Sequence, residues 1–335
     1  MMRQALLEGY KGLGLTAPNP SVGAIIVRDQ KIIARGHHQA AGKPHAEKQA
    51  LQDCHNQNHS PQGTDLYLTL EPCSTTGRTP PCTQAIIENG FRRVIWAADD
   101  PNPAHQGNAR QILTSAGIQV QTGILAHEAE ILHRGFFKVQ RQGLPWIIVK
   151  TALSLDGRIT RPPHETQWLT SKEALTDVQT IRGQVDAILT SGQTARTDNP
   201  RLTYRGPRTQ KKQPHRLIFT NQPQAGLPKK AHLLQTTQPT RFIKGDLKEN
   251  LQKLAQEGIQ TILVEAGGQL ISQLLAQNLV DEWISYLAPI ITGGPNPALS
   301  GTGAQNLSQR PRLTNISYQQ LGPDIRLQGY LKKQP

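Results

Sequence analysis

Three potential metal ligands in the N-terminal half of this chain lie far apart in sequence, and a fold has to bring them together. His45 lies in the segment Pro44-His45-Ala46-Glu47, and Cys73 and Cys82 follow later. Imidazole and thiolate are zinc ligands, and three protein ligands leave a fourth position open to water, as in catalytic zinc sites. Glu47, two residues after His45, is placed to move a proton without binding the metal. The pattern therefore predicts a zinc site with His45, Cys73 and Cys82 as ligands.

The spacing of the two cysteines departs from a known pattern. Zinc-dependent deaminases of nucleobases combine His-x-Glu with Pro-Cys-x-x-Cys, whereas eight residues separate Cys73 from Cys82. Taken singly, His45 is better explained as a surface histidine, and each cysteine as a small core residue. Their joint occurrence with Glu47 favours the metal site. The third cysteine, Cys54, is expected to be a spare thiol because a catalytic zinc takes three protein ligands.

Apolar runs alternate with helical patterns along the chain, which predicts layered α/β domains. In the first half we expect helices over 3–12, 46–54, 83–88 and 108–116, and strands over 22–27, 31–36, 65–70, 93–98 and 117–120, with a hairpin between the first two strands. In the second half we expect strands over 146–150, 187–190, 216–219, 261–264 and 283–289, a helix over 269–277, and loops over 205–214 and 221–240. A break at 142–145 divides the chain into two expected domains, 1–144 and 145–335.

The charge and composition limit the partners of such a chain. Its formal net charge is +13, but the basic residues are spread along the sequence without a long basic tail. Such a protein attracts phosphorylated metabolites as readily as nucleic acid. No apolar run approaches the ~20 residues that cross a bilayer, and the N-terminus lacks a secretory pattern. We therefore expect a cytoplasmic protein that binds neither nucleic acid nor membrane.

Several segments of the N-terminal half share motifs with one enzyme family. They are Pro18-Asn19-Pro20-Ser21-Val22-Gly23, Pro44-His45-Ala46-Glu47, Glu71-Pro72-Cys73-Ser74, Gly77-Arg78-Thr79-Pro80-Pro81-Cys82 and Asp100-Pro101-Asn102-Pro103. Together they resemble the bifunctional deaminase–reductases of riboflavin biosynthesis, whose long cysteine spacer contains Gly-Arg-Thr-Pro-Pro. The resemblance covers nearly the whole chain. It implies a cytidine-deaminase-like three-layer α/β/α domain over 1–144 and a dihydrofolate-reductase-like α/β domain over 145–335.

The same resemblance implies the chemistry of the first domain. A single Zn²⁺ supports deamination of 2,5-diamino-6-ribosylamino-4(3H)-pyrimidinone 5′-phosphate, and Glu47 shuttles the proton. Asn19 and His38 are implied to orient the base. The residues implied to hold the ribose phosphate are Arg78, Asp100 and Asn102. The chain has Gly107-Asn108-Ala109 where the family often has Gly-x-Gly, which leaves the geometry of this loop open.

The second domain carries a weaker signal of its own. Gly267-Gly268 lies between a strand and a helix, where backbone N–H groups can bind a phosphate, or where glycine only shapes a turn. Further segments resemble the reductase domain of the same family: Lys150-Thr151-Ala152-Leu153-Ser154-Leu155-Asp156-Gly157, Gln167-Trp168-Leu169-Thr170-Ser171, Asp186-Ala187-Ile188-Leu189-Thr190-Ser191-Gly192, Asp198-Asn199-Pro200-Arg201-Leu202-Thr203 and Val264-Glu265-Ala266-Gly267-Gly268. The implied activity is NADPH-dependent reduction of the ribosyl group of 5-amino-6-(5-phosphoribosylamino)uracil to ribityl.

The reductase resemblance also implies individual site residues. Those implied to line NADPH are Ala152, Trp168, Thr194, Asp198, Asn221, Gly267, Gly268, Gln269, Leu270, Ile271, Ser272 and Gln273. Those implied to line the substrate are Thr166, Arg182, Leu202, Arg205 and Glu265, with Lys150 and Asp156 as candidates near the reacting sugar. Trp168 is open to a second interpretation as a core aromatic residue. The family commonly has Asp-Asp-Pro where this chain has Asp198-Asn199-Pro200.

Two other functions remain open from the sequence. One is a tRNA or other nucleic-acid deaminase with an accessory domain, which the high isoelectric point favours. The other is a non-catalytic zinc scaffold, which leaves Glu47 without a role. The family resemblance further implies a homo-oligomer, a dimer or larger.

Overall fold

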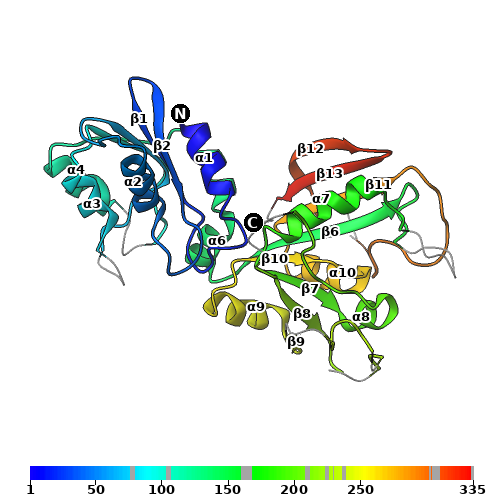
Figure 1. Cartoon of the computed structure of the whole chain (residues 1–335). Coiled ribbons are helices and arrows are strands. Elements are labelled where there is room, and N and C mark those ends of the chain that lie inside the picture. Colours follow the sequence, from blue (N-terminus) through cyan, green and yellow to red (C-terminus); the bar gives the residue numbers. More distant parts are fainter. Residues whose placement is uncertain are drawn as a thin grey trace. The chain divides into compact units, whose positions relative to one another are not determined.

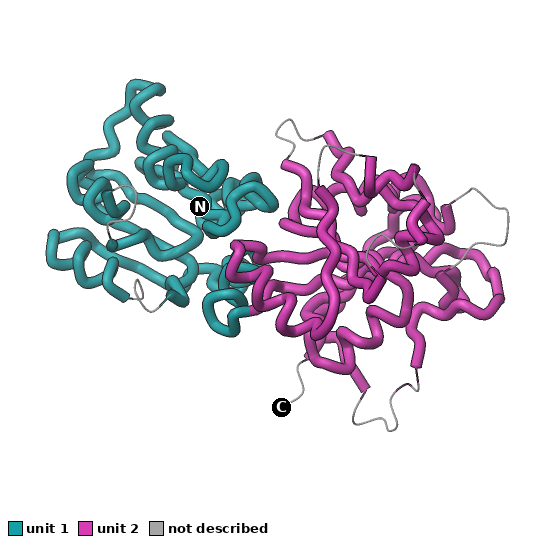
Figure 2. The backbone as a smooth tube through the Cα atoms, turned by 90° about the horizontal axis from the view of Figure 1, so that it is seen from below, with its two compact units in different colours: residues 1–143 teal, residues 144–335 magenta. Residues whose placement is uncertain are grey.

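The computed structural model describes residues 1–75, 80–102, 107–159, 168–207, 212–222, 226–228, 230–235, 239–301, 303 and 310–332. The chain divides into two compact units, residues 1–143 (unit 1) and 144–335 (unit 2), as Figure 2 shows. The division falls one residue before the expected boundary. Each unit is a layered α/β structure, which confirms the predicted fold class.

A mixed sheet forms the centre of unit 1 (Figure 1). In the described part of unit 1 its strands are β1 (Gly23–Arg28), β2 (Lys31–His37), β3 (Asp65–Leu70), β4 (Arg93–Ala98) and β5 (Gln119–Thr122), in the order β2-β1-β3-β4-β5. The predicted hairpin is present, because β1 pairs antiparallel with β2. β3, β4 and β5 run parallel, so their carboxyl ends meet at one edge of the sheet.

Helices cover both faces of this sheet and complete three layers. They are α1 (Met2–Tyr10), α2 (Ala46–Asn56), α3 (Cys82–Glu88), α4 (Asn108–Ser115), α5 (Ala126–Leu132) and α6 (Arg134–Gln142). Successive side chains of a strand point to opposite faces. Ile26 of β1 therefore packs with apolar side chains of α2, α3 and α4, whereas Ile25 packs with those of α1, α5 and α6.

Unit 2 is also built around a mixed sheet, which is larger than that of unit 1 (Figure 1). Its strands in the described ranges are β6 (Trp146–Ser154), β7 (Ala187–Ser191), β8 (His215–Phe219), β9 (Thr240–Ile243), β10 (Thr261–Val264), β11 (Glu282–Ala288), β12 (Leu313–Leu321) and β13 (Asp324–Leu331), in the order β12-β13-β11-β6-β10-β7-β8-β9. The strands from β11 to β9 in this order are parallel, and β13 and β12 add an antiparallel hairpin at one edge.

Each face of the second sheet also has its own helices. These are α7 (Lys172–Arg182), α8 (Gly192–Asp198), α9 (Leu247–Gln256) and α10 (Gly268–Ala276). α9 and α10 share one apolar core with the sheet, and α7 and α8 share the other. None of the helices in the described ranges is long and apolar enough to cross a membrane.

The element bounds agree with the sequence pattern in part. β3, β4 and β10 have the predicted ends, whereas β5 begins two residues later than expected. Gly117 adopts a φ of 82° and ends the preceding helix, and the Ile118 N–H still bonds back to the Leu113 carbonyl. The elements that the sequence analysis missed include α5 to α9, β9, β12 and β13. β12 is exposed along most of its length, so it lacks the alternation that marks a half-buried strand.

Candidate functional site

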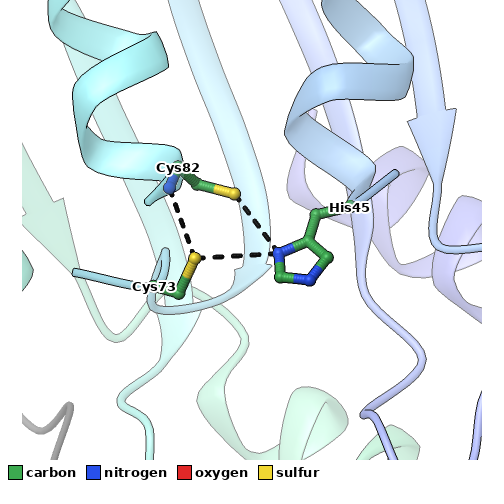
Figure 3. Close-up of side chains that lie close together, drawn as sticks. All are labelled: His45, Cys73 and Cys82. Atoms are coloured by element: carbon green, nitrogen blue, oxygen red, sulfur yellow. Dashed lines mark hydrogen bonds between the residues drawn. The ribbon is translucent and has the colours of Figure 1, made fainter. Parts of the chain in front are cut away.

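The three predicted metal ligands converge in unit 1. Their ligand atoms all lie within 4.8 Å of one another. His45 is the N-cap residue of α2, Cys73 follows the end of β3, and Cys82 is the first residue of α3. Figure 3 shows His45 Nδ1 facing both sulfur atoms, at 3.7 Å from Cys73 Sγ and 3.4 Å from Cys82 Sγ.

The donor set and its spacing fit a tetrahedral zinc. Zn–N and Zn–S bonds of about 2.05 and 2.3 Å at a tetrahedral angle place nitrogen and sulfur roughly 3.6 Å apart. The two observed distances lie on either side of this value. The Cys82 N–H also donates to Cys73 Sγ at 3.3 Å. Hydrogen bonding from the Cys82 side chain lowers the pKa of Cys73 to about 4, so a thiolate is favoured where a cation would bind.

Glu47 lies beside this cluster, in the first turn of α2, and its side chain is buried. Burial raises the pKa of the Glu47 carboxyl, and the neighbouring Cys73 raises it further. A carboxyl group in such surroundings can both accept and return a proton. This is the arrangement that the sequence analysis predicted for the shuttle.

Asn19 and His38 meet next to the metal ligands. The His38 Nδ1–H donates to the Pro44 carbonyl at 3.1 Å, because a carbonyl oxygen only accepts. Burial lowers the pKa of His38, so the ring is neutral and its Nε2 accepts a hydrogen bond from Asn19 Nδ2, also at 3.1 Å. The His38 ring also packs edge-on against His45, with ring centroids 5.4 Å apart. Both residues implied to orient the base therefore lie at the metal centre.

Asp100 and Asn102 lie at the same sheet edge, after β4. The Asn102 N–H donates to Asp100 Oδ1 at 2.9 Å, so the two residues form one tight turn. Arg78, the third residue implied to hold the ribose phosphate, lies outside the described residues. Gly107, where the chain departs from the family, has a φ of 75° and is the N-cap residue of α4. Glycine adopts this left-handed conformation without a steric cost.

A residue that the sequence analysis quoted but did not use, Glu71, holds this turn. Its carboxylate accepts hydrogen bonds from the backbone N–H groups of Asp100 at 3.2 Å, and of Gly107 and Ala109 at 3.3 Å each. Glu71 is buried directly after β3, two residues before Cys73. The sequence held a signal for this role of Glu71, since a carboxylate in the Glu-Pro-Cys segment at the end of a buried strand needs hydrogen-bond partners.

Cys54 is buried away from these ligands and donates to the His59 carbonyl at 3.5 Å.

In unit 2 the structure brings together three of the residues implied to line the reductase substrate. Arg182 binds Glu265 through two parallel hydrogen bonds, of 2.7 and 2.9 Å, and Lys150 Nζ lies 3.6 Å from Glu265 Oε2. Although burial opposes ionisation, the positive charges of Arg182 and Lys150 lower the pKa of Glu265 to about 2. The Arg182 side chain also donates to the Thr203 carbonyl at 3.2 Å.

Arg205 and Leu202 lie close to this cluster. Arg205 Nη1 donates to Thr203 Oγ1 at 2.9 Å. Burial lowers the pKa of Arg205, and the positive charges of Arg182 and Arg201 lower it further. The cluster therefore holds more positive than negative charge, which suits a phosphate group. Leu202 is buried, with a φ of 48°.

The glycine turn before α10 has a more specific geometry than the sequence suggests. The Gly267 N–H already donates to Thr194 Oγ1 at 3.1 Å, and the Ser191 hydroxyl donates to the same oxygen at 3.0 Å. A cofactor phosphate would thus meet the next N–H groups of α10, from Gly268 onward. Leu270 and Ile271 point into the apolar core, so their contribution to such a site is limited to the backbone.

Asp156, the other candidate near the reacting sugar, lies just after β6. Its carboxylate accepts hydrogen bonds from the Ser154 hydroxyl at 2.6 Å, and from the N–H groups of Thr292 at 3.1 Å and Gly293 at 2.9 Å. The hydrogen bond from Ser154 lowers the pKa of Asp156 to about 2. Asp156 therefore fastens the 292–293 turn to the end of β6, whereas Lys150 and Arg182 contact Glu265.

The remaining cofactor residues are spread over several elements. Trp168 is 69% exposed, which excludes its interpretation as a core aromatic residue. Asp198 is the last residue of α8, Asn221 lies in an exposed turn after β8, and Ala152 lies in β6. Thr166 lies outside the described residues, whereas Gln269, Ser272 and Gln273 lie within α10.

Asn199, where the chain departs from the family, has a defined structural role. Asn199 is the C-cap residue of α8 and has a φ of 43°. Asparagine tolerates this left-handed conformation better than most residues. Its Oδ1 accepts a hydrogen bond from the His232 N–H at 2.9 Å, so the side chain fixes a neighbouring segment.

Comparison with known proteins matches both units. The family described as the cytidine and deoxycytidylate deaminase zinc-binding region matches residues 1–98, and the RibD C-terminal domain family matches residues 145–327. The riboflavin biosynthesis protein RibD of Escherichia coli is 37% identical and covers 97% of this chain and 96% of its own length. RibD of Bacillus amyloliquefaciens is 36% identical, with 97% and 94% covered.

Solved structures agree over the same length. Acinetobacter baumannii RibD superposes with a TM-score of 0.88 at 36% identity, covering 99% of this chain and 98% of that one. A diaminohydroxyphosphoribosylaminopyrimidine deaminase/5-amino-6-(5-phosphoribosylamino)uracil reductase from Thermotoga maritima gives 0.87 at 29% identity, covering 99% and 97%. The chain therefore belongs to the RibD family, the bifunctional deaminase–reductases of riboflavin biosynthesis.

Proposed function

We propose that unit 1 deaminates 2,5-diamino-6-ribosylamino-4(3H)-pyrimidinone 5′-phosphate with Zn²⁺, and that unit 2 reduces the ribosyl group of 5-amino-6-(5-phosphoribosylamino)uracil to ribityl with NADPH. The observation that carries the proposal is the convergence of His45, Cys73 and Cys82 beside the buried Glu47. A second unit that matches the RibD C-terminal domain supports the pairing of the two activities.

In the first reaction water replaces the exocyclic amino group of the pyrimidine, and ammonia leaves. His45 Nδ1 and the two cysteine sulfurs would hold zinc, which supplies its capacity to lower the pKa of water. Glu47 accepts a proton from the attacking water and returns it to the departing ammonia, a role worth ~10²–10⁴ in rate. Asn19, which His38 holds by a hydrogen bond, would orient the base, and the Asp100–Asn102 turn would receive the ribose phosphate.

In the second reaction the residues of unit 2 bind and orient two anionic ligands. Arg182 and Arg205 would hold the substrate phosphate, and Glu265 fixes Arg182 through its two hydrogen bonds. Lys150 lies at the same carboxylate and is the charged side chain available to the sugar. The N–H groups at the start of α10 and the hydroxyl of Thr194 would hold the phosphates of NADPH, which supplies the hydride.

A coupled assay tests both halves. The purified chain receives the diaminopyrimidine phosphate and NADPH, and ammonia release and NADPH oxidation are followed together. We expect ammonia to appear first and NADPH oxidation to depend on it. Ammonia without NADPH oxidation would contradict the proposal for unit 2, and release of neither product would contradict it for both units.

The cellular setting of the enzyme is part of the same proposal. We propose that it acts in the cytoplasm as a homo-oligomer, a dimer or larger, on a phosphorylated pyrimidine and without nucleic acid or membrane. A nucleic-acid deaminase was the main alternative from the high isoelectric point. The RibD proteins match over 97% of this chain, unit 2 included, and so favour the phosphorylated pyrimidine. Activity on a tRNA anticodon stem, but not on the pyrimidine phosphate, would restore the alternative.

A further inference from the structure

Glu71 connects two parts of unit 1 that have different tasks in the proposed deamination. Its backbone continues the pairing of β3 with β4, because the Glu71 N–H donates to the Ala98 carbonyl at 2.9 Å. Cys73, a proposed metal ligand, follows two residues later on the same strand end. The Glu71 side chain, only 4% exposed, reaches the other way into the turn that carries Asp100 and Asn102.

The hydrogen bonds of Glu71 are divided between the Asp100–Asn102 turn and the start of α4. Oε2 accepts from the N–H groups of Asp100 at 3.2 Å and Gly107 at 3.3 Å, and Oε1 accepts from Ala109 at 3.3 Å. Residues 103–106, between Asn102 and Gly107, lie outside the described residues. One carboxylate thus fixes the first residue of the turn and the first residues of α4 at the same time.

Glu71 also supplies a hydrogen-bond acceptor for the start of α4, which has no capping side chain of its own. The N-cap residue of α4 is Gly107, which has no side chain to accept a hydrogen bond from the first turn. The first N–H groups of a helix need an acceptor, and their partial positive charge favours an anion. The Glu71 carboxylate provides both from the neighbouring strand.

We infer that Glu71 is a positioning residue that sets the distance between the metal centre and the Asp100–Asn102 turn, and so makes the deaminase selective for a 5′-phosphorylated substrate. This inference rests on the proposed function, because Asp100 and Asn102 receive the ribose phosphate there. Glu71 touches neither the metal ligands nor the base through its carboxylate in the described contacts. It acts through backbone N–H groups, which every residue except proline carries.

The test compares two substrates in the full chain loaded with zinc. Glu71→Gln replaces one acceptor oxygen with an NH₂ group that opposes the backbone N–H donors. We expect KM for the diaminopyrimidine ribosylamine 5′-phosphate to rise about tenfold, the scale set by lost hydrogen bonds to a charged group. We expect kcat to stay within about threefold, since the proton shuttle Glu47 is untouched. With the dephosphorylated ribosylamine, wild type and Glu71→Gln should give the same kcat/KM.

A matched control lies at the opposite end of the same strand. Asp65 begins β3 and is equally buried, and it binds Arg92 and Arg93 through hydrogen bonds of 2.6–3.1 Å. Asp65→Asn should lower the melting temperature without changing KM for either substrate. Zinc content and the reductase constants should be unchanged in both variants, which separates an effect on positioning from general damage to the fold.

Several results would overturn the inference. An unchanged KM in Glu71→Gln, or an equal loss on the phosphorylated and dephosphorylated substrates, contradicts a role through the phosphate turn. If Glu71→Gln does not fold, Glu71→Asp keeps the charge on a shorter side chain. In this variant too, KM must rise for the phosphorylated substrate, and kcat/KM for the dephosphorylated substrate must stay unchanged. If the wild type releases no ammonia from either substrate, the proposed function fails. Hydrogen exchange then tests the role of Glu71 directly. Its substitution must raise amide exchange at Asp100, Asn102 and residues 107–112, and leave residues 46–56 unchanged.

Discussion

Glu47 combines three properties at the scale of a single residue. It lies two residues after His45, a proposed metal ligand, in the first turn of α2, and its carboxyl is buried with a raised pKa. No other carboxyl is predicted to serve the deaminase as a proton shuttle. A glutamine side chain at position 47 would have the same shape as the glutamate but would not accept the proton. Glu47→Gln therefore removes the chemistry of this side chain without changing its shape.

We expect Glu47→Gln to retain zinc and to reduce the rate of ammonia release by ~10²–10⁴, the contribution of a positioned acid–base group. Metal analysis and an ammonia assay measure the two quantities. Glu88→Gln, an exposed position at the end of α3, is the control and should change neither. Substantial activity in Glu47→Gln would show that another group moves the proton.

Arg205 is the residue of unit 2 whose proposed role, binding the substrate phosphate, is tested by a single substitution. Its guanidinium lies among the positive charges of Arg182 and Arg201, with Glu265 as the neighbouring anion. Arg205→Ala should raise KM of the reductase for its phosphorylated substrate about tenfold, the scale of one lost charge-assisted hydrogen bond. Ammonia release should be unaffected, since Arg205 belongs to the other unit.

Arg241→Ala is the control for Arg205. Arg241 is an exposed residue of β9 that pairs with Glu257, at the far edge of the sheet. Its loss should leave both activities unchanged because surface ion pairs contribute little. A loss of both activities in Arg205→Ala would contradict two separate sites.

At the scale of an element, the two glycines before α10 have different reasons to be glycine. A Cβ on Gly268 would lie 2.8 Å from the Ala298 carbonyl oxygen and 3.0 Å from Leu299 Cα, both backbone atoms. Among the described residues, a Cβ on Gly267 would meet only Thr194 Oγ1, at 3.7 Å, which is ordinary contact. The backbone of residues 298–300 therefore packs directly on the first residue of the helix.

Gly268→Ala should destabilise unit 2 by about 1–3 kcal/mol, the usual cost of an overpacked contact. It should also raise the dissociation constant for NADPH, because the shifted backbone carries the N–H groups proposed to bind it. Gly267→Ala should do neither. Denaturant unfolding and NADPH titration distinguish the pair, and equal effects in both variants would refute the proposed difference.

At the scale of the whole molecule, unit 1 carries a buried group that couples its folding to pH. Burial lowers the pKa of His133 to about 4, and its Nε2 lies 3.2 Å from Thr69 Oγ1 beneath the sheet. In the unfolded chain the imidazole takes up a proton near its ordinary value of about 6.5. Between these values the unfolded state binds more protons than the folded one, so stability falls as the pH falls.

The free energy of unfolding of unit 1 should therefore decrease by up to about 3 kcal/mol between pH 6.5 and pH 4, and change little from this cause above pH 6.5. Hydrogen exchange at the amides of β3 and β4 measures unit 1 separately from unit 2. His133→Gln should flatten the dependence over this range. An equally steep dependence in the variant would assign the pH sensitivity to other groups.

Much of this architecture was predictable where the signal is local. β3 and β4 have the predicted bounds because an apolar run with turn residues on each side defines a buried strand. α7 was missed although Ala174, Val178 and Ile181 have helical spacing and are buried. The β12–β13 hairpin could not be found in this way, since most residues of β12 are exposed.

The sequence by itself determined the chemistry of the proposed metal centre, because the identities of His45, Cys73, Cys82 and Glu47 limit what they can bind and do. The tertiary structure alone decided how the sites are held. Glu71 binds backbone N–H groups up to Ala109, and Arg182 pairs with Glu265 across the carboxyl ends of neighbouring elements. Such partners leave no pattern in the chain, because every residue except proline carries the same N–H group and only the sheet brings strand ends together.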